Sequence, residues 1–268
     1  MNTNGNIYTI IYTTVIVAVV AAILAFASQS LKSRQDDNEK ADTISQMLTA
    51  AQFATKGDLQ KLGNTKVLAK YAEEIEQAFT VGTDGNKISD LNLDKVYSPK
   101  ELKKQNYKIK GGSDAELPVF IFKNGVTVVP VYGAGLWGPV WGYIAFEPSS
   151  DTIKGAYFDH ESETAGLGAK IKDDPAFQAE FVGKQAAFDK TPVFQIVKGA
   201  EGTLADNQID AITGATMTSQ GLDAAINTWF AAYAKFFLNN APKQDCCGNH
   251  EGCEGEHEHC ENHEATEE

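Results

Sequence analysis

A ten-residue segment near the C-terminus, DAITGATMTS from Asp210 to Ser219, has residue types that could hold a phosphate ester. The stretch from Gln220 to Leu238 has the spacing of an amphipathic helix that opens directly behind two hydroxyls. The unpaired N–H groups and the positive dipole end of a helix N-terminus favour a bound phosphate. A phosphate ester on Thr218 is therefore one hypothesis. The alternative is structural, because Thr218 or Ser219 could simply cap the helix.

Two glycine-rich segments precede this one, GAGLWG over residues 133–138 and ETAGLG over residues 163–168. With TGATMT over residues 213–218, they resemble, in this order, the FMN-binding domain of the C subunit of the sodium-translocating NADH:quinone oxidoreductase and of its relative, the G subunit of the RNF complex. The resemblance covers residues 1 to 240, and the Gly-Leu-Trp segment favours the quinone reductase protein. Ala165 departs from the family, which usually has Pro there, and predicts a looser loop.

The resemblance implies that FMN is held covalently, through a phosphoester on Thr218. A threonine hydroxyl is a poor nucleophile, and the sequence shows no adjacent His or Lys to activate it. A separate flavin transferase is therefore implied, which by resemblance uses FAD and a divalent metal. Small Gly214 and Ala215 would let that enzyme approach, Thr216 would be a recognition or phosphate-binding residue, and Asp210 a turn-former or recognition element.

The isoalloxazine ring needs an apolar wall with a few polar contacts. The resemblance implies that the other two motif loops supply it, through Leu136, Trp137, Glu163, Thr164, Leu167 and Gly168. The structural alternative is that GLWG forms a tight turn with a buried Trp, and that the glycines serve only backbone geometry. No residue is predicted to be catalytic. His160, in a polar loop, is interpreted as a solvated side chain.

By resemblance, the protein is a covalently flavinylated electron-transfer subunit of a membrane-bound sodium-translocating NADH:quinone oxidoreductase. It would take electrons from an iron-sulfur centre in the membrane subunits and pass them to the flavin of the B subunit. The chain has no dinucleotide-binding glycine fingerprint, so we expect no NADH site in it. The alternative within this class is the RNF subunit, with ferredoxin and NAD among the partners of its complex.

A second class of function comes from residues 244–268, which contain nine acids and no Lys or Arg. This acidic tail is predicted to be disordered. It is also a candidate site for Zn, Cu or Ni, although its spacing matches no standard zinc motif; disulfides or a solvated tail are the alternatives. The candidate ligands are Cys246, Cys247, His250, Cys253, His257, His259, Cys260 and His263. On this hypothesis the protein is a membrane-anchored metal-binding protein.

The N-terminus contains 21 uncharged residues over 7–27, after a short segment over 1–6. As a helix this stretch would span roughly 30 Å, which predicts one transmembrane anchor. The A-x-A-like site at 25–27 would fit a cleaved signal peptide, but no basic residue precedes the apolar run. Lys32, Arg34 and Lys40 follow the anchor and would place the body in the cytoplasm. The resemblance instead implies the outer face of the bacterial inner membrane.

The remaining sequence predicts an α+β fold, a mainly antiparallel sheet with packed helices behind the single transmembrane helix. Residues 28–80 are predicted as a helical stalk or linker, with helical spacing from 39 to 80, and residues 81–243 as the FMN-binding domain. Composition turns to β-formers from Tyr107, with strands predicted over 119–122, 126–129, 140–146, 152–158 and 192–197. A short helix is predicted from Asp174 to about Gln185.

Charge excludes nucleic acid as a partner. The whole chain has a net charge of −13, and setting aside the nine tail acids leaves a body of −4 with no basic face. All four cysteines also lie in the tail, so the body has neither a disulfide framework nor a cysteine nucleophile.

Overall fold

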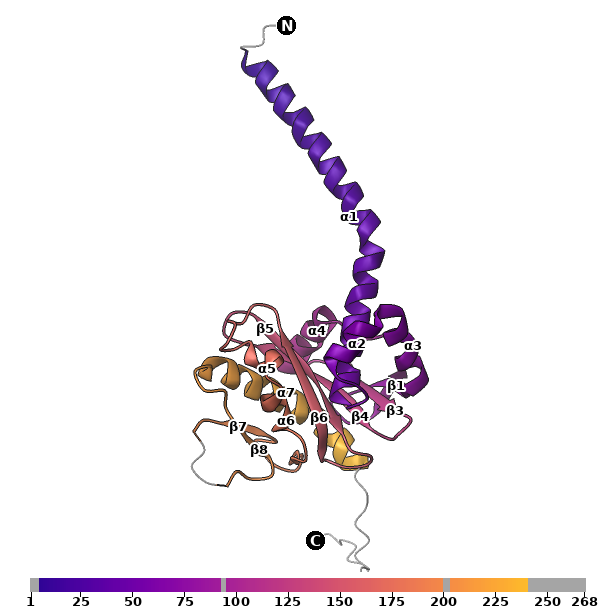
Figure 1. The fold of residues 1–268 in the computed structure, drawn as a ribbon, viewed down its shortest axis with the longest axis vertical. Coiled ribbons are helices and arrows are strands. Elements are labelled where there is room, and N and C mark those ends of the chain that lie inside the picture. Colours follow the sequence, from indigo (N-terminus) through magenta and orange to yellow (C-terminus); the bar gives the residue numbers. More distant parts are fainter. Residues whose placement is uncertain (1–4, 93–94, 200–202, 241–268) are drawn as a thin grey trace, which may run out of the picture.

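The computed structural model describes residues 5–92, 95–199 and 203–240. Its centre is a six-stranded antiparallel sheet with the order β2-β1-β3-β4-β5-β6, covered by helices on both faces (Figure 1). The strands are β1 (Ile75–Val81), β2 (Lys87–Asp90), β3 (Leu117–Phe122), β4 (Thr127–Ala134), β5 (Pro139–Phe146) and β6 (Ile153–His160). The predicted α+β class and the four predicted strands between residues 119 and 158 are confirmed.

Helix α1 (Asn6–Ala50) is 45 residues long and extends far beyond the sheet (Figure 1). Within the described ranges it is the one helix long and apolar enough to cross a membrane, with a mean hydropathy of 2.7 over its most apolar window. The predicted membrane segment, residues 7–27, lies in its exposed part. Burial begins at Ala41, so the C-terminal turns of the same helix belong to the body.

One face of the sheet is covered by the end of α1 together with α2 (Lys56–Leu62) and α3 (Asn64–Glu74). This layer buries Ile44, Met47, Leu48, Leu59, Val67 and Tyr71 against Phe120, Phe122, Val128, Tyr143 and Tyr157. The predicted helix is wrong from residue 75 onward, because Ile75–Val81 form strand β1 between β2 and β3. Its neighbouring residues Ala78 and Phe79 point to opposite cores, Ala78 to this one and Phe79 to the other.

The opposite face is covered by α4 (Pro99–Lys110), α5 (Lys170–Asp173), α6 (Pro175–Ala179) and the long C-terminal helix α7 (Thr216–Asn240). The predicted β character from Tyr107 is wrong for its first residues, since Tyr107 lies inside α4. The sequence does contain a local signal for helix α4, at the start of the helix. Pro99 is the first helical residue, and Glu101 Oε2 accepts a hydrogen bond of 3.0 Å from the Ser98 N–H, as in a capping box.

The chain between β6 and α7 forms only short helices and strands, and it leads into the DAITGATMTS segment. The helix predicted from Asp174 to about Gln185 ends at Ala179, and beyond it the Gly183 N–H donates 2.8 Å to Ile153 O. Strand β7 (Gln195–Val197) pairs in parallel with β8 (Gln208–Asp210). Asp223 of α7 accepts the Ile196 N–H at 2.7 Å, which ties this small sheet to the helix. Burial raises the pKa of Asp223, although that N–H opposes the shift.

Candidate functional site

Helix α7 begins at Thr216, so Thr218 is its third residue. The turn before it is closed by a 3.0 Å hydrogen bond from the Ala215 N–H to Ile212 O, with Gly214 at a φ of +83°. Ser219 Oγ accepts the Ile212 N–H at 3.1 Å. Neither Thr218 nor Ser219 is therefore the N-cap, and the capping alternative is wrong, because the helix starts four residues before the predicted Gln220.

The three motif segments meet at the carboxylate of Glu163. Thr218 Oγ1 donates to Glu163 Oε2 at 2.6 Å, and the Trp137 N–H donates to Glu163 Oε1 at 2.9 Å. Thr218 is 2% exposed and Glu163 is 7% exposed. Hydroxyl-to-carboxylate bonds of this length are charge-assisted and stronger than neutral ones. The fold thus brings residues 137, 163 and 218 together although they are far apart in the sequence.

Glycines let the backbone close around this carboxylate. A Cβ at Gly135 would collide with Glu163 Oε1, and a Cβ at Gly168 would collide with both Glu163 Oε2 and Thr218 Oγ1. A Cβ at Gly214 would lie 3.2 Å from Leu167 Cδ2, which places the ETAGLG loop against the turn before α7. Close approach, as well as turn geometry, explains the glycines of these motifs.

The Gly168→Ala variant is expected to lose about 1 to 3 kcal/mol of unfolding free energy, because its methyl group occupies the space of the Glu163–Thr218 hydrogen bond. Urea denaturation followed by circular dichroism measures this loss. Gly57→Ala is the matched control, since a Cβ at Gly57 in α2 meets nothing within 4 Å and alanine favours a helix. Equal stability of Gly168→Ala and the wild type would show that the loop accepts the methyl group.

Four large apolar side chains remain open to solvent in or next to the three motif segments. Leu136 is 49% exposed, Trp137 66%, Leu167 44% and Met217 57%. The structural alternative of a buried Trp137 is therefore wrong. Met217 was not among the predicted residues; its place beside Thr218 in the motif was the available signal. Exposed apolar side chains beside a buried polar group are the composition expected where an aromatic ligand packs.

The first turn of α7 also has unused donors. In the part of the chain that the structure describes, the N–H groups of Thr216, Met217 and Thr218 have no hydrogen-bond acceptor. Such first-turn donors suit a phosphate. The residues present thus fit an FMN phosphate held at the start of α7 with its ring against the apolar side chains.

The other predicted residues have mostly backbone roles. Thr164 is exposed, and its carbonyl accepts the N–H groups of Leu167 and Ala169 at 3.1 and 3.0 Å, which folds the ETAGLG loop. His160 is not simply solvated, because its Nδ1 accepts the Glu163 N–H at 3.2 Å. The Asp210 N–H donates 3.0 Å to Glu180 Oε2, while burial raises the pKa of Glu180. The candidate metal ligands between Cys246 and His263 lie outside the described residues.

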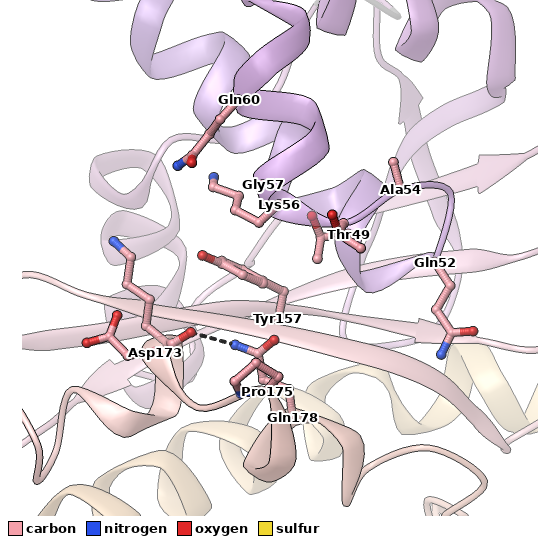
Figure 2. A pocket seen from close by; sticks show the side chains of 12 residues that line it. Thr49, Gln52, Ala54, Lys56, Gly57, Gln60, Tyr157, Asp173, Pro175 and Gln178 are labelled. Carbon is pink, nitrogen blue, oxygen red and sulfur yellow. Dashed lines mark hydrogen bonds between the residues drawn. The ribbon is translucent and has the colours of Figure 1, made fainter.

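A separate cavity of about 640 Å³ opens between α2, β6 and the α5–α6 segment (Figure 2). Tyr157 lies in it, with Lys56 Nζ 5.4 Å from the centre of the Tyr157 ring. Both lysines that line it are paired, Lys56 with Asp42 at 2.6 Å and Lys172 with Asp159 at 2.7 Å. Because no motif residue lines this cavity, we assign it no flavin role.

Comparisons with known proteins agree with the site. A family model described as the FMN-binding domain matches residues 135–231, which include Trp137, Glu163 and Thr218. The fold and the site thus define a flavoprotein of the FMN-binding-domain class.

The relatives of this chain belong to one particular family within this class. The C subunit of the Na(+)-translocating NADH-quinone reductase from Haemophilus ducreyi is 31% identical over 227 residues, covering 79% of this chain and 84% of that protein. The solved structure of the same protein from Parabacteroides distasonis superposes with a TM-score of 0.64 at 30% identity, covering 77% of this chain and 96% of that one. NqrC from Shewanella oneidensis gives 0.60 at 28%, covering 76% and 98%. The chain belongs to the family of the C subunit of the Na(+)-translocating NADH-quinone reductase.

Proposed function

We propose that this protein carries FMN as a phosphoester on Thr218 and relays electrons through it within a sodium-translocating NADH:quinone oxidoreductase. Bound FMN supplies reversible one- and two-electron redox chemistry. The observation that carries the proposal is the position of the Thr218 hydroxyl, in the first turn of α7, where all three motif segments converge on Glu163. Membership of the C-subunit family supports the same assignment.

The described residues have distinct parts in holding the flavin. The free N–H groups at the start of α7 would receive the phosphate, and Leu136, Trp137 and Leu167 would pack against the ring. A covalent bond keeps the carrier in place while it exchanges electrons with the neighbouring subunits. Because those subunits supply the other redox centres, this chain needs no nicotinamide site of its own.

The test is the mass of the peptide that contains Thr218, from protein made in a host with a flavin transferase and in the same host without it. We expect the mass of an FMN ester only with the transferase, and a fluorescent band on a denaturing gel in that sample alone. An unmodified peptide from the transferase-positive host would contradict the proposal, provided a known flavinylated protein is labelled in the same cells.

We further propose that α1 is a retained anchor and that the body faces the outer side of the bacterial inner membrane. The A-x-A-like site at 25–27 lies inside an unbroken helix, and the same helix continues into the core at Ile44 and Met47, which supports retention. Protease added to spheroplasts is expected to digest the body. Protection until the membrane is permeabilised would place it in the cytoplasm, as Lys32, Arg34 and Lys40 alone suggest.

The metal-binding function of the tail stays a prediction, since its residues lie outside the described ranges. Removing residues 244–268 separates the two functions. The flavin proposal predicts that quinone reduction by the assembled complex survives the deletion, whereas a function that resides in the tail is lost.

A further inference from the structure

We propose that Glu163 is the general base for the attachment of FMN to Thr218, so that the acceptor protein supplies the base that activates its own hydroxyl. The inference rests on the proposed covalent flavin. It answers a chemical difficulty, because a threonine hydroxyl is a poor nucleophile and the sequence around Thr218 offers no His or Lys. The tertiary structure places a carboxylate there from 55 positions away in the chain.

The distance between the Thr218 hydroxyl and the Glu163 carboxylate fits a general base and the proton that it accepts. Thr218 Oγ1 lies 2.6 Å from Glu163 Oε2, within the heavy-atom distance that proton transfer requires. The hydroxyl points its proton at the carboxylate, which leaves an oxygen lone pair for the phosphorus. The Trp137 N–H binds the other carboxylate oxygen, Oε1, at 2.9 Å, so Oε2 is the oxygen that can take the Thr218 proton.

Glu163 is held by two hydrogen bonds that do not come from the loop that follows it. Trp137 binds its side chain and His160 Nδ1 accepts its N–H at 3.2 Å, both from the β5–β6 end of the sheet. Thr218 is only 2% exposed, and Gly168 packs against its Oγ1, so we expect the transferase to displace Gly168 to reach the hydroxyl. Gly166, two residues before it, has a φ of +75°, and a Cβ added there would meet nothing within 4 Å, so this part of the loop is not packed against the body. The bonds from Trp137 and His160 would therefore keep the base beside the hydroxyl when Gly168 is displaced.

The step balances with FAD as the co-reactant that the transferase brings. Thr218 Oγ attacks the phosphorus on the riboflavin side, the Oγ–P bond forms, the pyrophosphate P–O bond breaks and AMP leaves. The proton of Thr218 passes to Glu163 Oε2. No atom is oxidised or reduced in this step. Because the proton arrives as the phosphodiester forms, the buried carboxyl becomes neutral beside the new anion and like-charge repulsion is avoided.

The experiment measures the flavinylation of detergent-purified full-length protein by purified transferase with FAD and Mg²⁺, at varied acceptor concentration. For Glu163→Gln we expect the rate at saturating acceptor to fall by about 10²- to 10⁴-fold, with little change in the acceptor concentration giving half-maximal rate. Glutamine keeps the size of the side chain and an acceptor for the Trp137 N–H, but it cannot take the proton. Glu163→Asp keeps a carboxylate and should recover part of the rate.

Glu161→Gln is the matched control, because Glu161 is an exposed glutamate of the same loop, and it should react like the wild type. Once labelled by long incubation, Glu163→Gln should keep its flavin and melt no lower than labelled wild type, since a neutral amide suits the phosphodiester. A normal rate for folded Glu163→Gln, with wild type labelled at Thr218, would overturn the base and leave the covalent flavin intact. Failure of the wild type to react would instead overturn the proposed function.

Discussion

The Thr218→Val variant is expected to have no covalent flavin. Valine matches threonine in shape but has no hydroxyl, so no phosphoester can form at this position. The measurement is ultraviolet flavin fluorescence of the protein band on a denaturing gel, from a host that has the transferase. We also expect a loss of about 1 to 3 kcal/mol in unfolding free energy, because the buried Glu163 Oε2 loses its donor.

Two variants make this result specific. Thr218→Ser keeps a hydroxyl next to Glu163 and should still be labelled, more slowly if the hydroxyl is less well oriented. Thr228→Val removes an exposed hydroxyl of the same helix that bonds only Ala224 O, and it should be labelled like the wild type. Fluorescence that persists in Thr218→Val would place the flavin on another residue and contradict the proposed attachment.

The largest effect on stability is expected for Trp229→Ala. Trp229 is fully buried in the core between the sheet and α7, and its Nε1 donates to Tyr132 O at 2.9 Å and to Asn106 Oδ1 at 3.2 Å. Removing so large a buried side chain costs about 3 to 5 kcal/mol. Tyr132 O and Asn106 Oδ1 would then lose their hydrogen-bond donor, which adds to this cost. Since typical domains have only about 5 to 15 kcal/mol in total, a large fraction of the stability should be lost.

Urea denaturation of the detergent-solubilised protein measures this change. Trp137→Ala is the matched control, because Trp137 is 66% exposed and its removal should change the unfolding free energy by less than about 0.5 kcal/mol. Equal losses in the two variants would mean that Trp229 does not anchor α7 to the sheet. Because the first turn of α7 contains Thr218, we also expect the folded fraction of Trp229→Ala to set the upper limit of its flavin content.

Much of the fold was predictable because local patterns coincide with the final elements. Val119, Val128 and Ile144 lie in β-rich runs that are buried on both faces, and the residues of α7 recur at helical steps. Strand β1 was not predictable in this way. Its apolar residues continue the three- and four-residue spacing of the preceding helix, and only pairing with β2 and β3 makes the segment extended.

In the candidate site too, some features follow from the local sequence and others only from the tertiary structure. The sequence alone determined the apolar N-terminal segment, the three motif segments and the threonine that suits a phosphate ester, because these depend on residue type and short-range spacing. Only the tertiary structure decided that Glu163 binds the Thr218 hydroxyl, that Trp137 is exposed, and that Gly135 and Gly168 close around one carboxylate. Hydrogen bonds between residues 26 and 55 positions apart depend on how strands β4, β5 and β6 align with α7, and no local pattern specifies that alignment.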